Sequence, residues 1–299
     1  MFKSINNNKI YILFIVIISM EAAESGFGSL KIVPAAREAA MGGAGVASAQ
    51  GPQAIYFNPA AISRYEKFSA NVHYAKWFLD THHQSFFLVR NAKIFNIGIG
   101  IVNFSYGKVE QREDKPTDEP IGYFDPQDFS LFLTLSRALD DRTAIGASGK
   151  FYYQKIFSNT ASGGGIDVGL KFNLSSNILL GFSVINFGTM LRYQREKFWL
   201  PTEVKIGASY ETAINNNGLV GTADLSYFAY DEKLSLGVGA EYALNDFLYL
   251  RGGYRPFSEA GKISSGFGVK LNNIRFEYSF SPYAFNLGTT HRFSIGFGY

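Results

Sequence analysis

Ten charged side chains stand at alternate positions of segments that otherwise resemble apolar strands. They are Lys150, Asp167, Lys171, Lys205, Asp224, Glu241, Arg251, Arg275, Glu277 and Arg292. Because successive residues of a strand point to opposite faces, these charges would share one face of a sheet and the apolar residues the other. A closed sheet of this kind would enclose a charged lumen.

The lumen charges have two interpretations. Four arginines near the end of the sequence, Arg251, Arg255, Arg275 and Arg292, could form a basic ladder that favours anionic solutes. Glu241 and Glu277 fall on adjacent predicted strands, however, and opposite charges on neighbouring strands pair with each other. We favour structural pairing over selectivity.

Residue types suited to catalysis are sparse. The four histidines are His73, His82, His83 and His291, and the adjacent pair would point to opposite faces of one strand, which suits a single metal poorly. No nucleophile elbow, zinc-binding helix motif or phosphate-binding loop occurs in a supporting context. We expect no enzyme activity, no metal and no cofactor.

The elements that would position the charges are strands. From about residue 67 onward the sequence consists of period-two runs, about fourteen in number. Examples are Phe129, Leu131, Leu133 and Leu135, then Ile166, Val168, Leu170 and Phe172. The pattern predicts an all-β protein, with a transmembrane antiparallel β-barrel over residues 67–299.

The connections alternate in length, as expected of outer-membrane barrels. Short turns near residues 91–93, 140–141, 175–177, 245–246 and 272–273 alternate with longer segments, of which 107–127 and 188–201 are the longest. An even strand count would leave the N- and C-termini on the periplasmic side. A soluble β-sandwich is the alternative, but it would bury its apolar face within about 100 residues.

The first 25 residues indicate export. Lys3 and Lys9 precede an apolar run over residues 10–20, followed by small residues, which is typical of a signal peptide. The run is too short for a membrane-spanning helix. There is no cysteine, and a net charge of +3 gives no reason to expect a nucleic-acid partner.

Residues 26–66 lack strand alternation and are rich in small residues. A short helix is expected from about Pro34, with Glu38 in its first turn and Gly42 and Gly43 ending it. Asn58 and Pro59 would start a turn or a second helix. Such a segment could fill the barrel lumen as a plug, or could be a periplasmic lead-in that packs on the barrel end.

This N-terminal segment resembles the signature of the PorV/PorQ family of outer-membrane proteins. The matching positions are Ala36, Arg37, Ala39, Met41, Gly42, Gly43 and Ala44, with Asn58, Pro59 and Ala60 downstream. Residues 166–170, 184–188, 200–201, 250–254 and 290–294 are similar to recurring family segments in the same order. The resemblance covers nearly the whole mature chain.

The resemblance implies a barrel like that of the long-chain fatty acid transporter FadL, with fourteen strands and an N-terminal hatch that moves to gate the lumen. Asn58, Pro59 and Ala60 match the hatch motif. The implied function is passive passage of hydrophobic small molecules across the bacterial outer membrane. The alternative is an accessory, shuttle or surface scaffold of type IX secretion, with secreted proteins as cargo.

The last residues predict a closing strand. Phe293, Ile295, Phe297 and Tyr299 alternate with Arg292, Ser294, Gly296 and Gly298, so the aromatic face would meet outer-membrane lipid and the other the lumen. Resemblance to other outer-membrane barrels implies that these four apolar residues are the signal read by the barrel assembly machinery.

Overall fold

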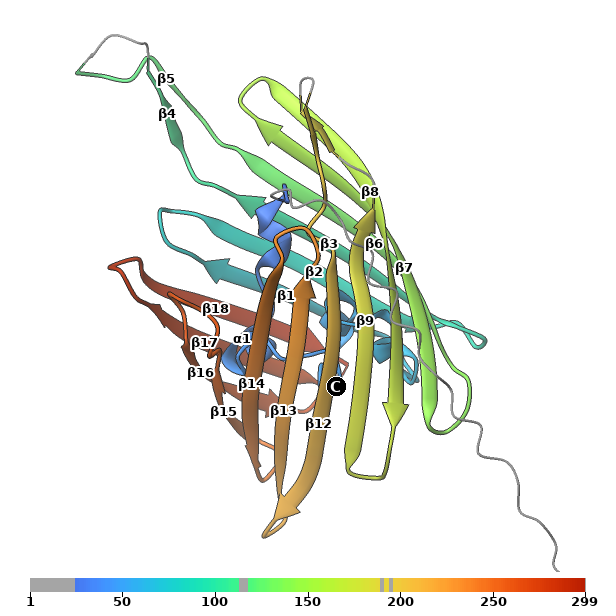
Figure 1. Cartoon of the computed structure of the whole chain (residues 1–299). Helices are drawn as coiled ribbons and strands as arrows, with labels where there is room; N and C mark the ends of the chain where they lie inside the picture. Colours follow the sequence, from blue (N-terminus) through green and yellow to red (C-terminus); the bar gives the residue numbers. More distant parts are fainter. Residues whose placement is uncertain (1–24, 113–117, 189–190, 194–195, 299) are drawn as a thin grey trace, which may run out of the picture.

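The computed structural model describes residues 25–112, 118–188, 191–193 and 196–298. Most of them belong to one closed antiparallel barrel (Figure 1), so the predicted fold class and strand number are confirmed. The fourteen barrel strands are β1 (Ser69–Lys76), β2 (His82–Asn91), β3 (Asn96–Ser105), β6 (Gln127–Ala138), β7 (Thr143–Ile156), β8 (Asn159–Asn173), β9 (Ile178–Gly188), β12 (Glu203–Ile214), β13 (Asn217–Phe228), β14 (Lys233–Leu244), β15 (Leu248–Tyr254), β16 (Ile263–Leu271), β17 (Ile274–Tyr283) and β18 (Gly288–Phe297).

The two faces of the wall differ as the alternation predicts. On β6, Leu131, Leu133 and Leu135 are exposed on the outside, whereas Thr134 and Ser136 are buried on the inside. In a closed barrel an apolar outer face meets lipid without leaving a strand edge unpaired. None of the helices in the described residues is long and apolar enough to span a membrane.

The barrel has a turn end and a loop end. The connections that follow β2, β6, β8, β12, β14 and β16 are short and share the turn end, as predicted. After β12 only Asn215 and Asn216 intervene, both with positive φ, which suits a tight hairpin. The long connections 107–127 and 188–201 lie at the loop end and carry the small hairpins β4 (Val109–Gln111)–β5 (Gly122–Phe124) and β10 (Leu191–Tyr193)–β11 (Glu196–Phe198).

The last strand closes the barrel. β18 pairs with β17 on one side and β1 on the other, and Phe297 lies opposite both Ile274 and Ala70. Phe293, Ile295 and Phe297 are half-exposed on the outer face, while Arg292 and Ser294 are buried inside. Tyr299 lies outside the described residues.

The N-terminal segment lies inside the barrel (Figure 1, blue), which is the plug arrangement. We call residues 26–66 the hatch. Its elements are η1 (Gly28–Lys31), α1 (Ala36–Ala40), η2 (Pro52–Tyr56) and η3 (Pro59–Ile62). The expected helix from about Pro34 is only α1, and Gly42 and Gly43 follow it with φ of 71° and 82°, a backbone that favours glycine.

The hatch runs from the loop end to the turn end. Ser25 Oγ donates a hydrogen bond to Asp231 in the β13–β14 connection, and Arg64 donates to the Asp140 carbonyl in the β6–β7 turn. On which side of the membrane the termini lie stays a prediction. The start of β1 and the end of β18 share the turn end, as the even strand count predicts, whereas Ser25 lies at the loop end. The reason is that the hatch crosses the barrel once before β1. The predicted signal peptide lies outside the described residues, apart from Ser25.

Removal of the last three residues tests closure. Deleting residues 297–299 removes a residue that pairs with both neighbouring strands, so we expect the chain to lose membrane assembly because an open edge cannot be satisfied in lipid. The measurement is the heat-dependent gel mobility of the protein extracted from membranes. Phe285→Ala, in the β17–β18 loop, is the matched control and should assemble normally. A truncated chain that still resists unfolding in detergent would contradict the prediction.

Candidate functional site

The hatch backbone approaches the wall at glycines. A Cβ atom at any of these wall positions would lie closer to the hatch than van der Waals contact permits. The contacts are Gly146 with Pro59, Gly169 with Asn58, Gly181 with Val46, Gly237 and Gly253 with Gly42, Gly239 with Met41, and Gly266 with Ala40. These wall glycines therefore make room for the hatch.

One buried arginine ties the hatch to the wall by charge. Arg37 Nε and Nη2 donate to the two Glu241 oxygens at 2.9 and 3.0 Å, and Arg37 Nη1 donates to the Ser48 carbonyl at 3.0 Å. Glu241 on β14 also accepts from Arg251 Nε at 2.5 Å, and Arg251 reaches Glu277 at 3.0 Å. Arg37 is 1% exposed. Forked pairs of this kind are stronger than neutral hydrogen bonds, and leaving one partner alone in the interior is costly.

Arg37 and Glu38 are adjacent buried charges of α1, and the balance between burial and neighbouring charges differs for the two. Burial alone would lower the pKa of Arg37, but Glu241 and Glu38 keep its pKa above the ordinary value. Burial raises the pKa of Glu38 by more than Arg37 lowers it. The contacts of the Glu38 carboxyl are long: Arg37 Nη1 donates to Oε1 at 3.4 Å, and Gln53 Nε2 donates to the two oxygens at 3.3 and 3.4 Å. The Glu38 carboxyl is therefore biased toward its neutral form.

Wall side chains satisfy the hatch backbone after α1. Asp224 Oδ2 accepts from the Gly45 and Val46 amides at 2.6 and 2.7 Å. Ser264 Oγ accepts from the Gly42 amide and donates to the Ala40 carbonyl. Without such partners the buried amides would lose the hydrogen bonds that they make with water in the unfolded chain.

The Asn-Pro-Ala motif joins two hatch segments and the wall. Asn58 Oδ1 accepts from the Ala60 amide, which caps η3, and Pro59 takes the first helical position. Asn58 Nδ2 donates to the carbonyls of Val46 and of Leu170 on β8, at 3.1 and 2.9 Å. That Asn58, Pro59 and Ala60 gate the lumen stays a prediction.

The ten predicted lumen charges all lie on the inner face, nine of them buried and Lys171 half-buried. Ion pairs join Lys150 to Asp167 at 2.6 Å and Lys205 to Glu203 at 2.8 Å, in addition to the Arg251 pairs. Glu203 was not predicted as a site residue. Arg292 donates to the Val33 carbonyl and packs on Trp77. These contacts favour structural pairing over a basic ladder.

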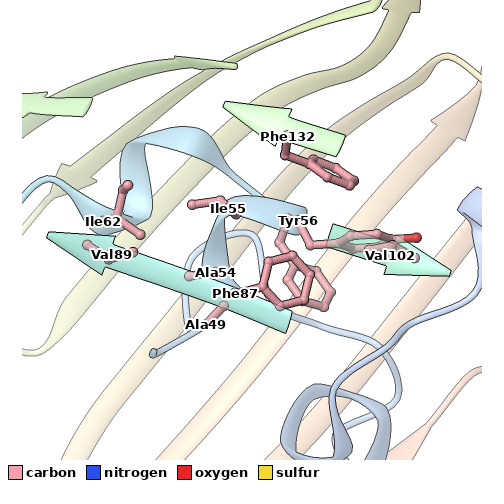
Figure 2. Packing of buried hydrophobic residues seen from close by; sticks show 10 residues of the cluster. Ala49, Ala54, Ile55, Tyr56, Ile62, Phe87, Val89, Val102 and Phe132 are labelled. Atoms are coloured by element: carbon pink, nitrogen blue, oxygen red, sulfur yellow. The ribbon is translucent and has the colours of Figure 1, made fainter. Parts of the chain in front are cut away.

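Sequence reasoning missed an apolar sector of the inner wall. Phe87, Val102 and Phe132 on β2, β3 and β6 are buried against hatch residues that include Ile55 and Tyr56 (Figure 2). The signal was present, because residues 86–89 are apolar without interruption, a pattern typical of a strand buried on both faces.

Metal ligation has no support within the described part of the chain, where no three His, Asp or Glu residues gather closely enough to hold an ion. His83 is buried on the inner face, and His82 lies on the other side of the same strand.

Solved structures of a transporter, a channel and a FadL homologue share this fold. The chain matches the toluene transporter TodX of Pseudomonas putida with a TM-score of 0.65 and 13% identity, over 87% of this chain and 95% of that one. The CymD monoaromatic hydrocarbon channel matches with a TM-score of 0.63 and 11% identity, over 89% and 97%. A FadL homologue of Pseudomonas aeruginosa matches with a TM-score of 0.56 and 13% identity, over 89% of this chain and 99% of that one. At these identities the similarity establishes a shared fold.

No family model and no curated protein matches the sequence. The PorV/PorQ resemblance therefore stays a prediction, while the FadL-like barrel that it implied is the fold observed.

Loss of the hatch arginine should weaken the closed state. Arg37→Met leaves Glu241 with one cationic partner, so we expect the free energy of unfolding to fall by about 3–5 kcal/mol. Urea unfolding from lipid vesicles provides the measurement. Lys31→Met, which breaks the partly exposed pair with Asp231, is the control and should cost about 1 kcal/mol or less. Equal losses for the two variants would show that the Arg37 pair is not a main tie.

The buried carboxyl of Glu38 gives a pH dependence of known sign. Since folding raises its pKa, Glu38 favours the folded state fully below its ordinary pKa, and this contribution is lost as pH rises through the folded pKa. Glu38→Gln should therefore be more stable than the parent at pH 8, with the difference shrinking as pH falls toward 4. Melting temperatures measured against pH test this. A Glu38→Gln variant that is less stable than the parent at pH 8 would contradict the sign.

Proposed function

We propose that this protein carries out passive passage of hydrophobic small molecules across the bacterial outer membrane, with the turn end facing the periplasm. The observation that carries the proposal is the apolar sector inside the barrel. Channels for water-soluble solutes have polar interiors, whereas Phe87, Val102 and Phe132 present aromatic and aliphatic surface to the lumen. The folds of TodX, CymD and the FadL homologue support the same proposal.

Passage requires the hatch to move, because its side chains fill the space between the apolar sector and the charged wall. The apolar side of the hatch, which includes Ile55 and Tyr56, packs where a hydrophobic solute would travel. Its other side holds the wall through Arg37 and the Asp224 carboxylate. Displacement would expose an apolar path on one side while the ionic tie limits how far the hatch travels.

A pair of glycine variants on β7 tests hatch movement. Gly146→Ala places a methyl group against the backbone of Pro59 and Ala60, so we expect a displaced hatch and faster entry of an apolar dye into vesicles, by about threefold or more. This figure corresponds to a shift of less than 1 kcal/mol in the hatch equilibrium. Gly149→Ala has nothing within 4 Å of its new methyl group and should match the parent.

Three results decide the proposal. Faster entry with Gly146→Ala alone supports it. Equal entry with and without the protein, for the parent and for Gly146→Ala, contradicts passage. Crosslinking in native membranes that captures secretion machinery or secreted cargo, together with no entry of dye, would favour the type IX secretion alternative.

A further inference from the structure

The first segment of the hatch occupies a separate apolar site near the loop end. We call Ser25 together with the first hatch residues, 26–31, the strap. Phe27 and Leu30 of the strap are 3% and 4% exposed and pack with Tyr152, Ala161 and Leu200. The Phe27 and Tyr152 rings lie 5.3 Å apart, in a tilted arrangement. We call the space bounded by Tyr152, Ala161 and Leu200 the chamber, and the chain fills it with one aromatic and one aliphatic side chain.

A hydrogen-bond acceptor borders the chamber. Ser29 Oγ donates to Asp128 Oδ2 at 2.6 Å, while Tyr106 and Gln154 also donate to Asp128, each at 2.8 Å. Asp128 lies opposite Gln154, and Tyr152 lies opposite Ser130, so Asp128 and Tyr152 are diagonal neighbours on the inner face of β6 and β7. If the strap leaves, Asp128 loses one of its three donors beside an apolar space.

Polar contacts at both ends of the strap add to its buried packing. Lys31 Nζ forms an ion pair with Asp231 at 2.6 Å, and this lysine side chain is 33% exposed. Ser25 Oγ donates to the same carboxylate, and Tyr56 donates to the Leu30 carbonyl. Phe27 has φ of 57°, a left-handed backbone that a bulky side chain adopts at a cost. Water at the loop end competes for the Asp231 contacts, so the strap is well suited to exchange with a ligand.

We infer that the chamber is a ligand site, now filled by the strap, whose ligand is a small uncharged aromatic or aliphatic molecule that carries one hydroxyl group. The ring or chain replaces Phe27 and Leu30, and the hydroxyl replaces Ser29 as a donor to Asp128. An anionic group finds no free cation there, because Lys150, near Tyr152 on the same face of β7, already pairs with Asp167 at 2.6 Å. The inference rests on the proposed passage of hydrophobic molecules and names the class that this entry site prefers.

Three ligands that share a toluene ring test the proposed preference for a hydroxyl group. The full chain in lipid nanodiscs is titrated calorimetrically with toluene, p-cresol and the methyl ether of p-cresol. A donor to a carboxylate should make p-cresol bind about tenfold more tightly than toluene. The ether keeps the ring but cannot donate, so it should bind no more tightly than toluene. Equal binding of p-cresol and its ether would overturn the inference.

Variants locate the effect. Asp128→Asn keeps the shape and loses the charge, so the preference for p-cresol should fall to about threefold or less. Asp141→Asn, an exposed aspartate at the turn end, should retain the tenfold preference. Phe27→Ala removes the larger of the two side chains that fill the chamber, so toluene and p-cresol should each bind about tenfold more tightly while the ratio of their affinities stays the same. An unchanged preference in Asp128→Asn, or no gain in Phe27→Ala, would overturn the assignment to the chamber.

The outcomes separate this inference from the function that it builds on. Toluene and p-cresol that bind equally well, with dye passage intact, contradict hydroxyl recognition alone. Failure of both ligands to bind the parent and Phe27→Ala, together with no dye passage, contradicts the proposed function as well.

Discussion

The structure depends on direct contact between two backbones, that of the hatch and that of the wall. At five wall glycines a Cβ atom would collide with the hatch backbone: Gly146, Gly181, Gly237, Gly239 and Gly253. Such contact brings peptide groups of the hatch near polar wall side chains, and Asp224, Ser264 and Ser183 accept from or donate to them. The barrel is therefore filled by its own chain, and the proposed passage through the lumen requires this contact to break.

The division of the inner wall into an ionic side and an apolar side supports the proposed opening of the filled barrel. On β14 to β17 the tie is ionic and directional, because Arg37 enters a row of Glu241, Arg251 and Glu277. On β2, β3 and β6 the contact is apolar and has no preferred partner (Figure 2). An apolar solute can replace apolar hatch side chains with little loss, whereas nothing apolar can replace Arg37. The ionic side is thus suited to act as a hinge for the hatch, and the apolar side is suited to the passage of an apolar solute.

Much of the fold could be predicted because period-two alternation directly indicates a strand whose two faces meet different environments. Leu131, Leu133 and Leu135 face outward, and Glu241, Arg251 and Glu277 face inward, as predicted. The same rule failed at Phe87 and Phe132, since these inward residues meet an apolar hatch instead of water. The pairing of Arg37 with Glu241 could not be predicted, because it joins residues 204 positions apart through a segment without periodicity. The position of the strap could not be predicted either. A plug in the lumen was one of the two expected arrangements, but the strand count does not show at which end of the barrel this segment begins.

A reversible lock between hatch and wall gives the most direct test that passage runs through the lumen. The chain has no cysteine, so Val46→Cys with Gly207→Cys introduces a single pair. The pair is made in an Asp224→Ala parent, because the Asp224 carboxylate lies against Gly207 where the new Cβ atom would stand. The two Cβ atoms would start 3.0 Å apart, so the hatch shifts outward by about half an ångström to reach disulfide geometry. The measurement is apolar dye entry into vesicles before and after reduction. The account predicts no entry while the disulfide is intact and recovery of the parent rate once it is reduced. Entry at the same rate in both states would contradict a path through the lumen.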